Sequence, residues 1–159
     1  MIYLIDTSSL ICLINKYPEE IFKTLYENFN NNINNGNIKS PIQVLHEIKQ
    51  KDDILYKWLI NFRKIFFIET DNEILQKAAE IISNYHELIK NLGLSNTGED
   101  PADPYLIATG IIMGRRMIDE TKIITEEGNK KNHIPDIAGK YNIKSMHILE
   151  FFKEMKWKF

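Results

Sequence analysis

Five acidic residues of this chain lie where a predicted strand or helix begins or ends: Asp6, Glu47, Asp103, Glu126 and Glu127. Carboxylates that gather at one point repel one another unless a cation neutralises them. Ligation by oxygen alone is typical of a hard cation such as Mg²⁺ or Mn²⁺, and Mg²⁺ usually keeps several waters. The residue types therefore predict a divalent-metal site at which water could attack a phosphodiester.

Each of these carboxylates also has an ordinary structural interpretation. Asp6 precedes "TSS" and would cap the next helix, an interpretation that the stretch alone favours as much as a site. Asp103 would cap a helix in the same way. Glu47 by itself is typical of a solvated helix residue, and Glu126 and Glu127 would suit a turn. Their shared position at the ends of elements is what favours a site.

The elements that must position these residues alternate along the chain. Short apolar runs predict strands at 2–5, 38–40, 65–68, 122–125 and 143–146. Helical periodicity separates them, which is typical of an α/β fold with a mainly parallel sheet. Strands of a parallel sheet bring their carboxyl ends to one edge, where ligands bind. The acidic residues are therefore expected at that edge.

Capping signals and periodicity predict where the helices lie. A second helix is expected to open at Pro18 and to end in the Asn-rich stretch 28–37, which we interpret as a loop. Ser40 and Thr70 predict caps of two later helices, the second running to about Leu92. A buried helix is expected to begin at Pro101 or Pro104, and two short helices follow near the C-terminus.

The composition is that of one globular domain, spanning 1–159. The formal net charge is −2, which does not indicate a strongly basic nucleic-acid-binding surface. Cys12 is the only cysteine, so no intramolecular disulfide can form and a reducing compartment, the cytoplasm, is expected. We find no secretory signal, and the longest apolar run is too short to span a bilayer.

Four stretches of the chain resemble the PIN-domain family when taken together and in order. They are "YLIDTSSLI", "PIQVLHEI", "ADPYLIATG" and "KIITEEG", and the first and third are the most specific. The later "IPDIAGKYNIK" resembles a PIN-like subgroup without a settled cellular role. The resemblance covers essentially the whole chain. It implies a three-layer α/β/α sandwich around a parallel sheet of four or five strands.

The resemblance also implies roles for particular residues. It makes Asp6, Glu47 and Asp103 the core acidic residues. A fourth acid usually follows a strand-end threonine by two residues and is commonly aspartate, which maps here onto Thr125 and Glu127. The longer side chain departs from the family pattern, and Glu126 could take its place. Ser8 is expected to support the first aspartate.

The resemblance implies a metal-dependent ribonuclease, often the toxin of a toxin–antitoxin pair. The expected metal ligands are Asp6, Asp103 and Glu127, for Mg²⁺ or Mn²⁺. RNA is the expected substrate, an antitoxin protein or a second copy of the chain is a candidate partner, and no membrane is expected. A catalytically silent PIN-like module that binds RNA or protein is the alternative. The candidate phosphate contacts are Arg115, Arg116, Lys130 and Lys131.

Overall fold

The protein is built around a parallel sheet of five strands, in the order β3-β2-β1-β4-β5. The structure is a computed structural model that describes residues 1–87 and 100–159. The strands are β1 (Ile2–Ile5), β2 (Ile38–Pro41), β3 (Phe67–Ile68), β4 (Thr121–Ile124) and β5 (Lys144–Met146). The predicted α/β fold with a parallel sheet is confirmed.

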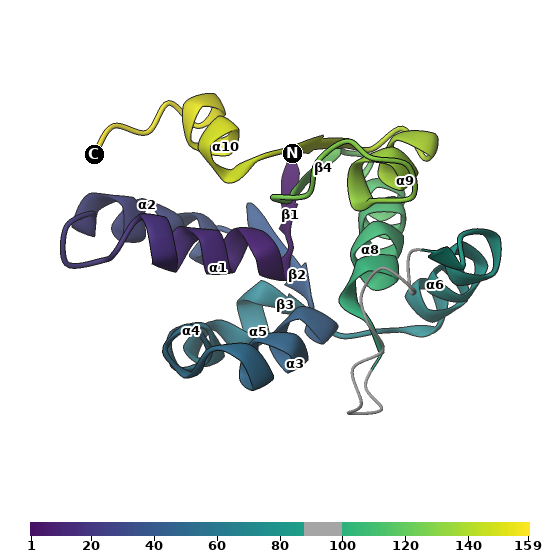
Figure 1. Ribbon diagram of the computed structural model, residues 1–159, viewed down its shortest axis with the longest axis horizontal. Coiled ribbons are helices and arrows are strands. Elements are labelled where there is room, and N and C mark those ends of the chain that lie inside the picture. The colour runs from purple at the N-terminus through teal and green to yellow at the C-terminus, as the bar shows by residue number, and fades with distance from the viewer. Residues whose placement is uncertain (88–99) are drawn as a thin grey trace.

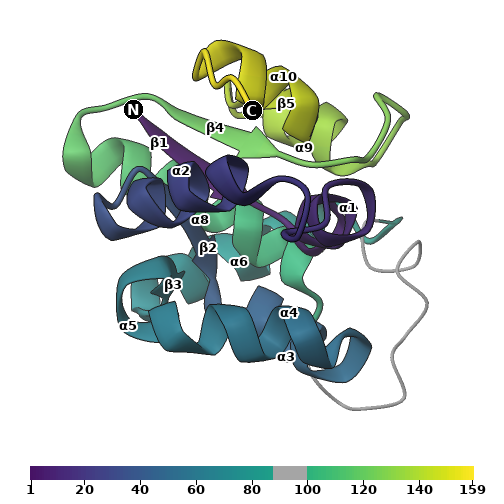
Figure 2. The same ribbon diagram turned by 90° about the vertical axis from the view of Figure 1, so that its left-hand side faces the viewer.

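Helices cover both faces of this sheet (Figures 1 and 2). One face carries α1 (Thr7–Lys16), α2 (Lys23–Asn34), α3 (Ile42–Lys51), α4 (Asp53–Leu59), the short α5 (Arg63–Phe66) and α10 (Ile148–Glu154). The other face carries α6 (Asn72–Asn84), α8 (Ala102–Met117) and α9 (Ile134–Lys140). The result is the expected three-layer sandwich.

Two hydrophobic cores lie between these layers, because alternate residues of a strand point to opposite faces. Tyr3 and Ile5 of β1 pack in the core under α1, α2 and α10, whereas Ile2 and Leu4 pack in the core under α8. In the second core, Gly110 allows α8 to lie close to the sheet. A Cβ atom there would lie 3.0 Å from the Ile143 side chain and 3.3 Å from Leu4.

The sheet has a topological switch point between β1 and β4. From β1 the chain builds outward through β2 and β3, and it then returns to add β4 and β5 on the other side. The register places Ile5 beside Ile124, so the residues that follow, Asp6 and Thr125, emerge together. Ligands of open α/β sheets bind at such a crevice outside the carboxyl ends of the strands.

The boundaries of α2 differ from those expected. The helix begins at Lys23 instead of Pro18, and it continues through the Asn-rich stretch to Asn34. Phe29 and Ile33 are both fully buried within that stretch. Burial of these two side chains on one helix face outweighs the low helix propensity of asparagine.

Several capping predictions were also wrong in detail. Ser40 lies in β2, and its hydroxyl donates a 2.7 Å hydrogen bond to the Ile5 carbonyl instead of capping α3. Asp71, and not Thr70, caps α6 by accepting from the Ile74 amide at 3.0 Å. Residues 65 and 66 end the short helix α5, so the strand there is only two residues long.

Helix α6 ends at Asn84, with Tyr85 as its C-cap, and not near position 92 as expected. The stretch 93–99, which suits a loop, falls outside the described residues. Within residues 1–87 and 100–159, no helix is long and apolar enough to cross a membrane.

Candidate functional site

Asp6 lies at the switch point and is held by four hydrogen bonds from three neighbouring residues. It is the N-cap of α1, where Oδ1 accepts from the Ser9 amide at 2.8 Å. The Ser8 hydroxyl lies 2.9 Å from Oδ1 and 2.8 Å from Oδ2. The Thr125 hydroxyl donates to Oδ2 at 2.7 Å. The capping interpretation of Asp6 is therefore confirmed, and its carboxylate is also fixed at the edge of the sheet.

Burial makes this carboxylate a weaker acid than usual. Asp6 is 5% exposed, and desolvation raises its pKa to about 6. The three neighbouring donors oppose that rise, and the charge of Glu127 adds to it. A buried carboxylate whose charged form is disfavoured in this way gains stability from a proton or from a cation.

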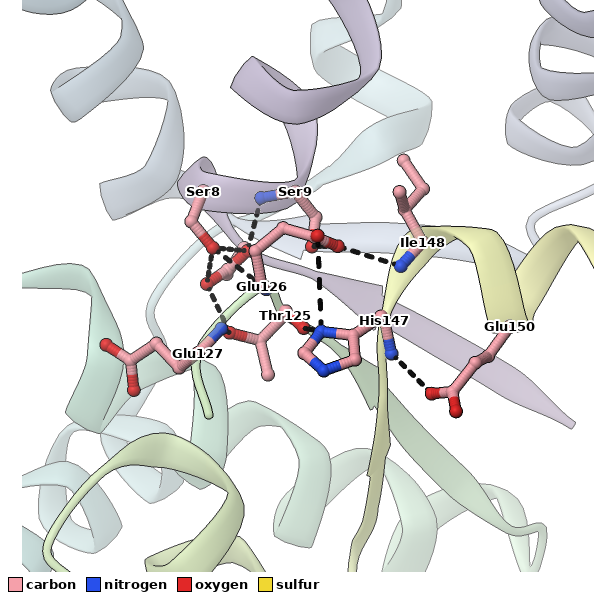
Figure 3. Close-up of polar contacts among 9 residues, drawn as sticks. Ser8, Ser9, Thr125, Glu126, Glu127, His147, Ile148 and Glu150 are labelled. Atoms are coloured by element: carbon pink, nitrogen blue, oxygen red, sulfur yellow. Dashed lines mark hydrogen bonds and ion pairs between the residues drawn. The ribbon is translucent and has the colours of Figure 1, made fainter. Parts of the chain in front are cut away.

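Ser8 and Thr125 also connect the two strand ends (Figure 3). The Ser8 hydroxyl accepts from the Glu126 amide at 3.1 Å, and the Thr125 hydroxyl accepts from the Glu127 amide at 3.1 Å. The loop after β4 is therefore fastened to the β1–α1 junction through the groups that bind Asp6. The structure thus brings Ser8 and Thr125 to the positions expected of supporting residues.

Glu47, on α3, joins the β1–α1 junction to the start of α8. Its Oε2 accepts a 2.6 Å hydrogen bond from the Thr7 hydroxyl, and its Oε1 accepts from the Ala102 amide at 3.1 Å. Lys51 lies one turn further along α3, with its Nζ 3.8 Å from the carboxylate. The sequence analysis missed Thr7, although it belongs to the "DTSS" stretch that marked this site.

Asp103 lies in the first turn of α8 and is 8% exposed. The N-cap position of this helix is Pro101, so the alternative interpretation of Asp103 as a helix cap is excluded. Burial raises the pKa of Asp103 well above its usual value, and the charges of Glu127, Asp6 and Glu47 raise it further. Carboxylates from three other segments of the chain therefore act on Asp103 at this edge.

Glu126 and Glu127 turn to opposite sides of the loop (Figure 3). Glu126 accepts from the Ile148 amide at the start of α10 at 2.8 Å. Glu127 accepts from the Ile134 amide at the start of α9 at 2.8 Å, and its charge acts on both Asp6 and Asp103. The electrostatics therefore favour Glu127 over Glu126 as the fourth acid of the site.

The four candidate phosphate contacts separate into two pairs. Arg115 and Arg116 lie in the last turn of α8, roughly 18 Å along the helix from Asp103. Arg116 is paired there with Asp71, at 2.7 Å. The exposed Lys130 and Lys131 lie in the loop between β4 and α9, close in sequence to Glu127. The lysines are therefore near Glu127 along the chain, whereas the arginines lie at the far end of α8 from Asp103.

The donor set fits a hard cation, although it is not a closed cage. In the part of the chain that the structure describes, no three His, Cys, Asp or Glu side chains form a group that could hold a metal. Mg²⁺ needs only one or two carboxylates, since waters complete its shell. Asp103 meets this need, because none of the described residues donates a hydrogen bond to its buried carboxylate.

Comparison with known proteins gives the family. A family model described as "Domain of unknown function (DUF4411)" matches residues 3–159. The chain belongs to the DUF4411 family. No curated protein matches this DUF4411 chain.

A solved structure shares the fold of the DUF4411 chain. It is the "Crystal structure of VapBC2 from Rickettsia felis bound to a DNA fragment from their promoter", with a TM-score of 0.54 and 18% identity. The match covers 92% of this chain and 98% of that chain. At this identity the similarity shows the fold alone, and it agrees with the α/β/α sandwich described above.

Proposed function

We propose that this DUF4411 chain is a divalent-metal-dependent endoribonuclease of the PIN-like type. The observation that carries the proposal is the burial of Asp6 and Asp103 at the switch point of the sheet, where the charges of Glu127 and Glu47 also act on Asp103. The four sequence stretches that resemble PIN domains contain these residues. The fold shared with the VapBC2 structure supports the same assignment.

Asp6 and Asp103 would hold the metal, and Glu127 would act on it through a bound water, since no three acidic side chains of the described residues form a group that could hold an ion. Bound Mg²⁺ or Mn²⁺ would supply a water of lowered pKa and would neutralise charge on the phosphate. Ser8 and Thr125 fix the Asp6 carboxylate, since their hydroxyls contact both of its oxygens.

Glu47 would hold Asp6 and Asp103 in fixed positions relative to each other. It is hydrogen-bonded to the residue after Asp6 and to the residue before Asp103. Lys130 and Lys131 would attract RNA phosphates to the mouth of the site. We do not assign such a role to Arg115 and Arg116, because they lie at the other end of α8.

A toxin role follows as the second part of the proposal. The VapBC2 structure is described as that of a complex bound to promoter DNA, and the sequence resemblance is to a family with many toxins. We therefore propose an antitoxin protein as partner, a second copy of the chain as a further partner, and the cytoplasm as the place of action.

A cleavage assay on a pool of structured and single-stranded RNAs tests the proposal. The parent should cleave RNA with added Mg²⁺ or Mn²⁺ and stop when EDTA is added. Asp6→Asn should lose cleavage and remain folded, because the change keeps the side-chain size and removes the charge that a metal needs. Cleavage by Asp6→Asn at the parental rate under limiting metal would show that the site is misassigned.

A silent PIN-like module that binds RNA or protein is the second candidate function. It is favoured by the hydrogen bonds that Glu47 and Glu127 already accept from backbone amides at the starts of α8 and α9. RNA binding without turnover, at any tested concentration of Mg²⁺ or Mn²⁺, would support this candidate and exclude the nuclease.

A further inference from the structure

A groove of about 680 Å³ runs beside β5, the edge strand of the sheet. Residues 143–147 form one wall, and Pro135 and Gly139 of α9 form part of another. Its volume is within the range of about 300–1,000 Å³ that is typical of small-molecule sites. Of the residues that line this groove, Thr125 and Glu127 alone have a role assigned above.

The groove opens directly onto the acidic site. Thr125 and Glu127 line it, and Thr125 is the residue whose hydroxyl holds Asp6. A strand of nucleic acid with one phosphate at the acidic residues would therefore continue into the groove.

The lining also has neutral polar side chains that an occupant can reach. Asn129 and Asn142 line the groove and are both exposed. The Ser145 hydroxyl is buried without a partner, so an occupant of the groove would not reach it. Such neutral donors and acceptors suit the edge of a base and a ribose better than they suit a phosphate.

His147 gives the groove an aromatic surface. Its Nδ1 lies 3.1 Å from the Thr125 carbonyl oxygen, which holds the ring at the junction between the groove and the acidic site (Figure 3). Sequence-specific RNA recognition uses unpaired bases that stack on aromatic or histidine side chains.

We propose that this groove binds the ribose and base of a nucleotide adjacent to the cleaved phosphate of single-stranded RNA. The assignment rests on the proposed ribonuclease function and names its substrate as unpaired RNA. His147 provides the stacking surface, and Asn129 and Asn142 provide hydrogen bonds. The other candidate occupant is an extended polypeptide that pairs with the edge of β5, and the test below separates the two.

Gly139 allows the groove to be filled without disturbing the fold. A Cβ atom at this position would meet nothing within 4 Å, and the glycine lies in α9 without a positive φ. Gly139→Leu would therefore place a side chain in the groove. Gly139→Ala is the matched control, since it makes the same backbone change and adds one methyl group.

The experiment measures binding of a fluorescent single-stranded RNA decamer by anisotropy in EDTA, where metal-dependent cleavage cannot occur. Gly139→Leu should weaken binding about tenfold or more, the loss expected when one stacked base is displaced. Gly139→Ala should bind like the parent. Asn129→Ala removes an exposed amide of the loop that lines the groove, so it should fold normally and bind several-fold more weakly.

A second substrate separates this inference from the proposed function. Hydrolysis of bis(p-nitrophenyl) phosphate with Mn²⁺ needs no nucleoside subsite, so Gly139→Leu and the parent should have the same rate. Absence of hydrolysis of both this diester and RNA would overturn the nuclease, whereas the anisotropy comparison would still decide the subsite. Equal RNA affinity in the parent, Gly139→Leu and Asn129→Ala would overturn the subsite and would favour an extended polypeptide as the occupant of the groove.

Discussion

The hydroxyl of Thr125, at the end of β4, donates a 2.7 Å hydrogen bond to Asp6, at the end of β1 and 119 positions earlier in the chain. Both residues are buried, with Thr125 1% exposed. The same hydroxyl accepts from the Glu127 amide at 3.1 Å. One side chain therefore sets the position of the first aspartate and the direction of the loop that carries the fourth acid.

Thr125→Val should lower RNA cleavage with little change in the fold. Valine has the same shape, but it leaves Asp6 Oδ2 without one donor and the Glu127 amide without its acceptor. Loss of a partner that orients a metal ligand typically costs roughly tenfold to a hundredfold in activity or metal affinity. Thr125→Ser keeps the hydroxyl and should recover most of the activity in the same assay. Equal rates for parent and Thr125→Val would show that the hydroxyl does not position Asp6.

The metal-free protein should be less stable at pH 8 than at pH 5. Asp6 has a folded-state pKa of about 6 and an ordinary value of 3.8, so between these values the folded state holds a proton that the unfolded chain has released. The resulting stabilisation is complete below pH 3.8 and is lost as the pH rises through 6. A shift of this size corresponds to about 3 kcal/mol. Urea unfolding in EDTA across this range measures it.

Asp6→Asn is the control for this pH dependence, because asparagine does not titrate. The variant should show a flatter profile and should equal or exceed the parent in stability at pH 8, where the parent carries a buried charge. The raised pKa of Asp103 acts in the same direction, so some slope should remain. A profile that is unchanged in Asp6→Asn would contradict this assignment of the titrating group.

The strand positions and the acidic residues were predictable because their signals are local. Ile2 to Ile5 form an apolar run followed by a capping aspartate. In the structure the run is β1, and Asp6 is the N-cap of α1. The hydrogen bond of Ser40 was not predictable in this way. Its "SP" pattern predicts a helix cap, but the hydroxyl donates to the Ile5 carbonyl of a neighbouring strand. Such a partner becomes visible only when the strand order is known.

The choice between Glu126 and Glu127 shows the same limit within the site. Adjacent residues on a loop point to opposite sides, and the sequence does not say which side faces Asp6. The structure separates them through the helices that they approach, since Glu126 meets the start of α10 and Glu127 the start of α9. The continuation of α2 through the Asn-rich stretch was missed for a related reason, because the burial of Ile33 depends on packing that the Asn-rich composition does not indicate.

Asp103→Asn should abolish RNA cleavage, whereas Asp100→Asn should have a much smaller effect. The Asp103 carboxylate is buried beside three other acids, and Asp100 is exposed and accepts a 3.0 Å hydrogen bond from the Tyr105 hydroxyl. Neither residue caps α8, so the comparison tests the site and not the start of the helix. Cleavage rates at saturating Mn²⁺ measure the difference. Equal losses of cleavage rate in the two variants would show that Asp103 is not the metal ligand of this segment.

Mg²⁺ or Mn²⁺ should raise the melting temperature of the parent, and much less that of the double variant Asp6→Asn with Asp103→Asn. A ligand that binds only the folded state adds about 2.7 kcal/mol when its concentration is a hundredfold above Kd. The unfolded chain cannot reproduce the site, because Asp6 and Asp103 come from distant segments. The metal would also remove the repulsion that raises the pKa of Asp103.

Ionic screening is the competing explanation for such a shift, since salt weakens repulsion between any exposed charges. Monovalent salt at matched ionic strength separates the two, because it screens surface charge without entering a buried carboxylate site. Ca²⁺ serves as a second control, because it prefers more ligands at longer distances than Mg²⁺ does. Equal stabilisation of parent and double variant, or stabilisation matched by monovalent salt, would leave these carboxylates without a metal. The silent module would then be the better account of the fold.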